Sequence, residues 1–237
     1  MIRVLKPGGQ RLRPAITDAG TANLILATGS SQFDFLKAFK TDTSVEWSKI
    51  TVFHLDEYRI CPISIRPVSA DTCANGSWMK SDRLRYLLEG DARDIEAEIK
   101  RYENLLRSHP VDVACIGIGE NGHIAFNDPG VADFNDPHLV KVVELDEACR
   151  RQQLGEGWFP SFGDVPTHAL SLTIPAIMSS RTISCVVPDA RKAQAVYDTV
   201  NGPVSTLCPA SVLRNHNDVI LFLDRYSAQK LEGCSPS

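Results

Sequence analysis

Polar and titratable side chains are concentrated in one stretch of the chain, Val111 to Gly130, which reads VDVACIGIGENGHIAFNDPG. Its first half is rich in apolar residues, as in a strand that is buried on both faces of a parallel sheet. We expect this strand to end at Gly119, and Asn121, His123 and Asp128 follow soon after. Groups placed just past the carboxyl end of a buried strand lie where open α/β sheets bind ligands. The stretch therefore predicts a binding or catalytic site.

The same stretch contains the spacing GxGxxG, in Gly117, Gly119 and Gly122. This spacing is typical of dinucleotide-binding turns, which need a long helix that opens at the third glycine. Here Pro129 and Gly130 come too soon for such a helix. We therefore do not predict a dinucleotide cofactor.

A second candidate site lies early in the chain. Residues 22–27 (ANLILA) form an apolar strand candidate, and a helix is predicted over residues 33–39. Small residues stand between the two elements: Thr28, Gly29, Ser30 and Ser31. A strand, a glycine with hydroxyl residues and a helix start present free backbone N–H groups and a positive dipole end, which together bind anions. This segment predicts a phosphate site, although a serine that only caps the helix is the alternative.

The complete string GxGxNGHIAFNDPG resembles the signature of the glucosamine-6-phosphate deaminase/isomerase family, whose fold is shared with 6-phosphogluconolactonases. Two further segments are similar to the family, HLDEY at residues 54–58 and PTHALSLT at residues 166–173. The lactonase version keeps the Gly-His pair but lacks the ending in Phe, Asn, an acid and Pro. Residues 126–129 (FNDP) therefore favour the deaminase side.

The resemblance implies an aldose–ketose isomerisation with loss of ammonia, and it implies a role for each matching residue. Asp56 would be the carboxylate base that moves a proton from C2 to C1 of the sugar, and His123 would open the sugar ring. Asn121 stands where the family carries Asp or Asn, and Asp128 stands where Glu is usual. The neutral amide and the shorter acid put the efficiency of ring opening in question. A surface or capping role is the alternative for Asp56, and a structural one for His123.

The resemblance also implies how the substrate is held. Lys192 matches the family's phosphate-binding lysine and would act together with Thr28–Ser31. Residues 146–165 correspond to the family's mobile lid, where Arg150 or Arg151 could reach the phosphate or pair with surface acids. No metal or organic cofactor is implied. The expected partner is a small-molecule sugar phosphate.

The resemblance breaks between Ile60 and Asp82. Where the family continues with a segment like LPxxHPASFRRYLxERF, this chain reads ICPISIRPVSADTCANGSWMKSD. If these codons are read one base out of register, permitted wobble bases give LPxxHPASFRRYLCERFVDEVG. We therefore interpret residues 60–82 as out of frame relative to a family gene, through a pair of indels or a sequence error. As written, the segment removes a surface helix beside Asp56 and is expected to impair activity.

The remaining pattern predicts the elements that position these residues. Apolar runs that suit strands alternate with segments that suit helices, which favours an α/β fold with a doubly wound, mostly parallel, Rossmann-like sheet. The strands are predicted at residues 22–27, 49–54, 111–118, 139–145, 181–187 and 217–224. The helices are predicted at residues 33–39, 95–106 and 174–178, with another that begins at 188–193 and a short one near 15–20. Residues 1–237 contain no linker or repeat, so a single domain is expected.

Composition excludes several classes of protein. The net charge is −4 and the basic residues are scattered, so no nucleic-acid partner is expected. No apolar run is long enough for a membrane span or a secretion signal, which predicts a cytoplasmic protein without a membrane partner. The seven cysteines form no CxxC pair. Self-association into a homo-oligomer stays open.

The sequence thus predicts a deaminase/isomerase that converts glucosamine 6-phosphate to fructose 6-phosphate and ammonia. Two alternatives stay open: a hydrolase of the 6-phosphogluconolactonase type, and a non-catalytic homologue that binds sugar phosphates. The preference between glucosamine and galactosamine 6-phosphate is not predicted.

Overall fold

The computed structural model describes residues 7–43, 45–59 and 85–231. The atypical segment at residues 60–82 lies outside these ranges, so its reading-frame interpretation stays a hypothesis.

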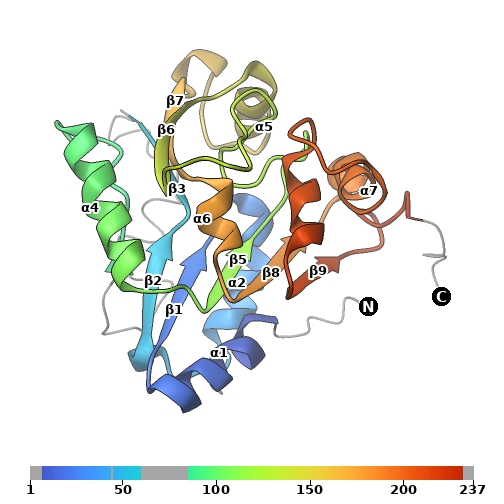
Figure 1. Ribbon diagram of the computed structural model, residues 1–237. Coiled ribbons are helices and arrows are strands. Elements are labelled where there is room, and N and C mark those ends of the chain that lie inside the picture. The colour runs from blue at the N-terminus through green and yellow to red at the C-terminus, as the bar shows by residue number, and fades with distance from the viewer. Residues whose placement is uncertain (1–6, 44, 60–84, 232–237) are drawn as a thin grey trace.

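A six-stranded parallel sheet forms the centre of the molecule (Figure 1). Its strands, in spatial order, are β4 (Arg85–Tyr86), β2 (Ile50–His54), β1 (Ala22–Leu26), β5 (Val113–Ile116), β8 (Thr182–Val187) and β9 (Val219–Leu223). Every neighbouring pair runs parallel. The chain proceeds outward from β1 in one direction and from β5 in the other, so the strand order reverses between these two strands. The predicted doubly wound α/β fold is confirmed.

Helices cover both faces of this sheet because successive strand residues point to opposite sides. On one face Leu24 and Val113 pack against α1 (Pro7–Ala19) and α2 (Phe33–Lys40). On the other face Ile25 and Ala114 pack in the cluster that includes α4, α6 and α7. These helices are α4 (Ile95–Ser108), α6 (Ile174–Met178) and α7 (Ala193–Asn201). Short 3₁₀ helices are η1 (Ser30–Gln32), η2 (Trp47–Lys49), η4 (Phe162–Asp164), η5 (Ala190–Lys192) and η6 (Pro209–Asn215).

A second sheet, which the sequence did not predict, contains three antiparallel strands. They are β3 (Asp56–Tyr58), β7 (His168–Leu172) and β6 (Val140–Glu144). Figure 1 shows this sheet together with α5 (Glu147–Gly155) beyond the end of the large sheet toward which β1 and β2 point. A separate apolar cluster that includes Tyr58, Val143 and Cys149 joins the small sheet to α5. The small sheet therefore lies over the carboxyl ends of the parallel strands (Figure 1).

The amino-terminal helix α1 is longer than the predicted short helix near residues 15–20. Pro14 argued against a longer helix because proline lacks an N–H donor and crowds the preceding turn. Leu12, Ala15 and Ile16 are buried against the sheet, and this packing outweighs the local cost. None of the helices in the described parts of the chain combines the length and apolar character that a membrane span requires.

Candidate active site

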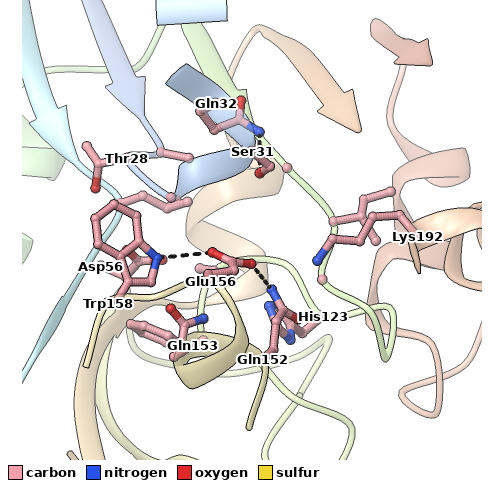
Figure 2. Close-up of a pocket in the computed structure, with 18 of the residues that line it drawn as sticks. Thr28, Ser31, Gln32, Asp56, His123, Gln152, Gln153, Glu156, Trp158 and Lys192 are labelled. Carbon is pink, nitrogen blue, oxygen red and sulfur yellow. Dashed lines mark hydrogen bonds between the residues drawn. The ribbon is translucent and has the colours of Figure 1, made fainter. Parts of the chain in front are cut away.

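A pocket lies at the carboxyl ends of the parallel strands, where the strand order reverses between β1 and β5. Its walls come from the segments that follow β1, β2, β5 and β8, and α5 and the residues after it close it (Figure 2). Most residues predicted from the sequence line it: Thr28, Gly29, Ser31, Asp56, His123 and Lys192. Such a switch point is where open α/β sheets bind their ligands. Residues far apart in the sequence therefore meet in one pocket.

His123 is supported from behind by a buried carboxylate. Its Nδ1 lies 2.8 Å from Oδ1 of Asp128, a residue only 1% exposed. Asn121 donates from Nδ2 to the same Asp128 oxygen over 2.8 Å, and its Oδ1 accepts from the His123 backbone N–H over 3.1 Å. A carboxylate at Nδ1 keeps the proton on that nitrogen, which leaves Nε2 to accept one. Asn121 and Asp128 thus act on His123 without lining the pocket.

The loop geometry of this segment depends on two of its glycines. A side chain at Gly119 would overlap the imidazole of His123, which packs directly against the backbone there. Gly122 has a φ of +83°, a conformation that favours glycine. The described residues between Gly122 and Gly130 contain no helix, as Pro129 and Gly130 predicted. The glycine spacing serves the placement of His123.

The carboxyl group of Asp128 is charged despite its burial. Burial alone would raise the pKa of Asp128, but hydrogen bonds from His123 and Asn121 outweigh it and hold the pKa below its usual value. Burial, together with the Asp128 charge, raises the pKa of the neighbouring Cys149 thiol.

The metal-ligating atoms of His123, Asp128 and Cys149 all lie within 4.8 Å of one another. Such a set could also ligate a thiophilic metal such as zinc.

Asp56 is the first residue of β3 and pairs in register with Ser171 of β7. Strand β7 also fixes the loop that follows His123, because Asn127 donates from Nδ2 to the carbonyl oxygen of Leu172 in β7 over 2.8 Å. The small sheet therefore sets the position of Asp56 relative to His123. Burial, and then the charge of Glu57, raise the pKa of Asp56 to about 7. A carboxylate with such a pKa is well matched to proton transfer near neutral pH.

Thr28 lines the pocket and is held by a histidine that sequence reasoning missed. Thr28 Oγ1 lies 3.3 Å from Nε2 of His54, and both side chains are buried. Burial lowers the pKa of His54 to about 4, so its imidazole is neutral. His54 therefore orients the Thr28 hydroxyl without adding charge to the pocket.

The predicted phosphate segment also contributes Gly29 and Ser31 to the pocket, and Gly29 lies at the amino-terminal end of η1, which leads into α2. Gln32 anchors it to the end of β8 by donating from Nε2 to the Val186 carbonyl oxygen over 2.9 Å. Lys192, only 3% exposed, enters from η5. Burial lowers its pKa, and the charge of Glu156 opposes this shift. Ser30 lies at the rim, where it borders a neighbouring groove.

The segment expected to act as a lid, residues 146–165, contributes residues other than the arginines considered from the sequence. Arg150 donates to the carbonyl oxygens of Phe162 and Val165, and Arg151 pairs with Glu147, so neither lines the pocket. The lid residues that do line it are Gln152, Gln153, Glu156 and Trp158. The lid segment also forms the helix α5, although its sequence shows few apolar repeats. Asp146 caps this helix by accepting from the Cys149 N–H over 2.6 Å. That cap was the local signal for the helix.

Comparison with known proteins gives consistent matches. A family model described as glucosamine-6-phosphate isomerases/6-phosphogluconolactonase matches residues 8–221. A glucosamine-6-phosphate deaminase of Listeria welshimeri is 38% identical over 222 residues, which cover 93% of this chain and 92% of the relative. A deaminase of the same name from Streptococcus uberis is 38% identical over 216 residues, with 90% and 89% covered.

Solved structures agree with this match. A monomeric glucosamine-6-phosphate deaminase superposes with a TM-score of 0.81 at 32% identity, and 95% of each chain is covered. A 6-phosphogluconolactonase from Shewanella baltica superposes with a TM-score of 0.71 at 17% identity, covering 91% of this chain and 88% of that one. The second likeness concerns the fold alone.

Proposed function

Because the chain belongs to the glucosamine-6-phosphate isomerase/6-phosphogluconolactonase family, we propose that it is a glucosamine-6-phosphate deaminase. The reaction consumes glucosamine 6-phosphate and water and yields fructose 6-phosphate and ammonia. The observation that carries the proposal is that Asp56, His123 and Lys192 line the same pocket. A base, a proton carrier and a cation for phosphate thus face one pocket.

The phosphate group is bound between the start of η1 and Lys192. Backbone N–H groups at the start of a helix and a buried ammonium group are complementary to an anion. The hydroxyl of Ser31 lines the pocket at the same place. This arrangement directs the sugar ring away from Lys192 and toward Asp56 and His123.

His123 opens the pyranose ring. Its Nε2 accepts the proton of the anomeric hydroxyl and returns a proton to the ring oxygen, so the imidazole ends the step unchanged. Asp128 stabilises the transient imidazolium because its carboxylate lies 2.8 Å from Nδ1. Asn121 holds Asp128 in place through its own hydrogen bond.

Asp56 then carries the C2 proton to C1. The ionised carboxylate removes the proton from C2, and the protonated acid delivers it to C1. The product is a ketose imine, which adds water at C2 and releases the nitrogen as ammonia. The pKa of about 7 suits a group that must both take up and return a proton.

The proposal is tested by incubating the protein with glucosamine 6-phosphate and measuring fructose 6-phosphate and ammonia together. Equal amounts of both products are expected, and the variants D56N and H123Q should lose the activity while they still melt cooperatively. Galactosamine 6-phosphate in a parallel reaction determines the preferred epimer. Hydrolysis of 6-phosphogluconolactone without ammonia release would refute the proposal in favour of a lactonase, and binding without turnover would refute catalysis.

A cytoplasmic location fits this proposal. A sugar phosphate carries two negative charges near neutral pH and does not cross membranes unaided, so the substrate is found where it is made. Fractionation of cells that produce the protein tests the location.

A further inference from the structure

A carboxylate occupies the centre of the pocket, and the proposed reaction does not use it. Glu156, at the end of α5, accepts a hydrogen bond at Oε2 from Ser30 Oγ over 2.6 Å. Trp158 Nε1 donates to the same oxygen over 3.1 Å, and Gln152 Nε2 donates to Oε1 over 2.8 Å. Figure 2 shows Glu156 between the wall that carries Ser31 and the one that carries His123. The side chain is thus held inside the space where a ligand would bind.

Glu156 reaches the phosphate end of the pocket from its rim. The shortest hydrogen bond of Glu156 comes from Ser30, which belongs to the segment that we assign to phosphate. Burial lowers the pKa of Lys192, and among the acidic residues Glu156 opposes this shift most strongly. The other charges near Lys192 are those of Glu120, Arg191 and Asp189. Arg191 is itself paired with Glu120 and Asp189, so Glu156 is the carboxylate that enters the pocket toward Lys192.

The remaining space is small when Glu156 is in place. The pocket has a volume of about 100 Å³, whereas pockets for small molecules generally measure about 300–1,000 Å³. A phosphate dianion would also be repelled by the carboxylate at this short range. Movement of Glu156 away from this position would relieve both the lack of space and the repulsion.

We propose that Glu156 is an internal anion that occupies the phosphate site and must be displaced by the substrate phosphate, so that it lowers the affinity of the site for anions. The proposal deepens the proposed function and rests on its assignment of the phosphate site. Displacing Glu156 weakens the binding of every anion by a similar factor. Inorganic phosphate has only the contacts of this site to offset that cost, whereas a sugar phosphate adds contacts near Asp56 and His123.

The test compares E156Q and E156A with the unmodified protein by calorimetric titration with inorganic phosphate. E156Q keeps the size of the side chain and an oxygen that accepts from Ser30, and removes only the charge. We expect it to bind inorganic phosphate about tenfold more tightly, or better. E156A should bind at least as tightly as E156Q because it also vacates the space. The KM for glucosamine 6-phosphate should fall in parallel.

The matched control is E147Q. Glu147 lies in the first turn of the same helix, is exposed and pairs with Arg151, so its loss changes the net charge equally but not the pocket. E147Q should leave phosphate affinity within about twofold of the original value. Melting curves of all variants verify that each is folded.

The outcomes separate this inference from the proposed function. If E156Q leaves phosphate affinity unchanged and raises the KM for glucosamine 6-phosphate, Glu156 contacts the substrate's ammonium group instead, and the inference is wrong while the proposed function stands. If E156Q and E156A tighten phosphate binding but no form of the protein releases ammonia, the inference stands and the proposed function fails. Equal tightening in E147Q would reduce the effect to net charge and overturn the inference.

Discussion

Replacing Asp128 with asparagine tests whether the buried carboxylate assists His123. The substitution keeps the shape of a side chain that is only 1% exposed, and it removes the charge 2.8 Å from His123 Nδ1. An asparagine amide can still accept from Asn121, so the loop geometry should survive. What is lost is the stabilisation of the imidazolium that forms during ring opening.

The size of the effect follows from that one interaction. A hydrogen bond between an ionised pair contributes about 1.5–3 kcal/mol, and each 1.4 kcal/mol in a barrier is about a factor of ten in rate. We therefore expect kcat/KM for glucosamine 6-phosphate to fall roughly 10- to 150-fold in D128N. The KM should change little, because Asp128 does not line the pocket.

The assay is the initial rate of fructose 6-phosphate formation, with melting curves as a check on folding. D133N is the matched control, since Asp133 lies in the same loop, is exposed and only caps a local turn. D128E should not exceed the original activity, because the additional methylene must enter a buried space. A folded D128N with kcat/KM within twofold of the original would refute the reasoning.

Three other predictions follow from the site. Because burial and Glu57 raise the pKa of Asp56 to about 7 and the base must be ionised, kcat/KM should rise with pH through a midpoint near 7 and level off above it. E57Q should move this midpoint to lower pH, and a midpoint near 4 in the original protein would contradict the assignment. The substitution K192M retains a buried apolar side chain and removes its charge. The KM for glucosamine 6-phosphate should therefore rise by about tenfold or more without a lower melting temperature. An unchanged KM would exclude a phosphate contact. Resequencing of the gene and peptide masses across residues 60–82 should reveal a shifted frame, and an uninterrupted frame with matching masses would disprove it.

The parallel sheet could be predicted because its strands are continuous apolar runs, as in Ala22–Leu26 and Val113–Ile116. The second sheet could not. Its strand β3 is the polar triplet Asp-Glu-Tyr, which pairs with residues 169–171 far along the chain. Such pairing depends on tertiary contacts that a local pattern does not contain. The length of α1 was missed for the same reason, since Pro14 lowers the local preference and burial against the sheet outweighs it.

The convergence of Asp56, His123 and Lys192 could be predicted because the carboxyl ends of parallel strands meet at one edge. The presence of Glu156 in the pocket could not, since an isolated acid between glycines in a polar segment is generally a surface residue. A cation was considered for the lid, and both arginines are engaged elsewhere. Whether an acidic or a basic side chain of this segment faces the pocket depends on how α5 is rotated over the pocket, and no short sequence pattern specifies that rotation.

Asp128 stands where the resemblance implies a longer acid, and the structure shows how Asp128 and Asn121 together support His123. The shorter acid put the efficiency of ring opening in question, but its oxygen lies 2.8 Å from Nδ1 of His123. Asn121 draws that oxygen into place by donating to it, while its own carbonyl oxygen accepts from the His123 backbone. A carboxylate at position 121 could not donate unless it held a proton, and it would place two acids at hydrogen-bond distance. The amide is therefore the partner that lets one short, buried carboxylate remain charged beside the imidazole.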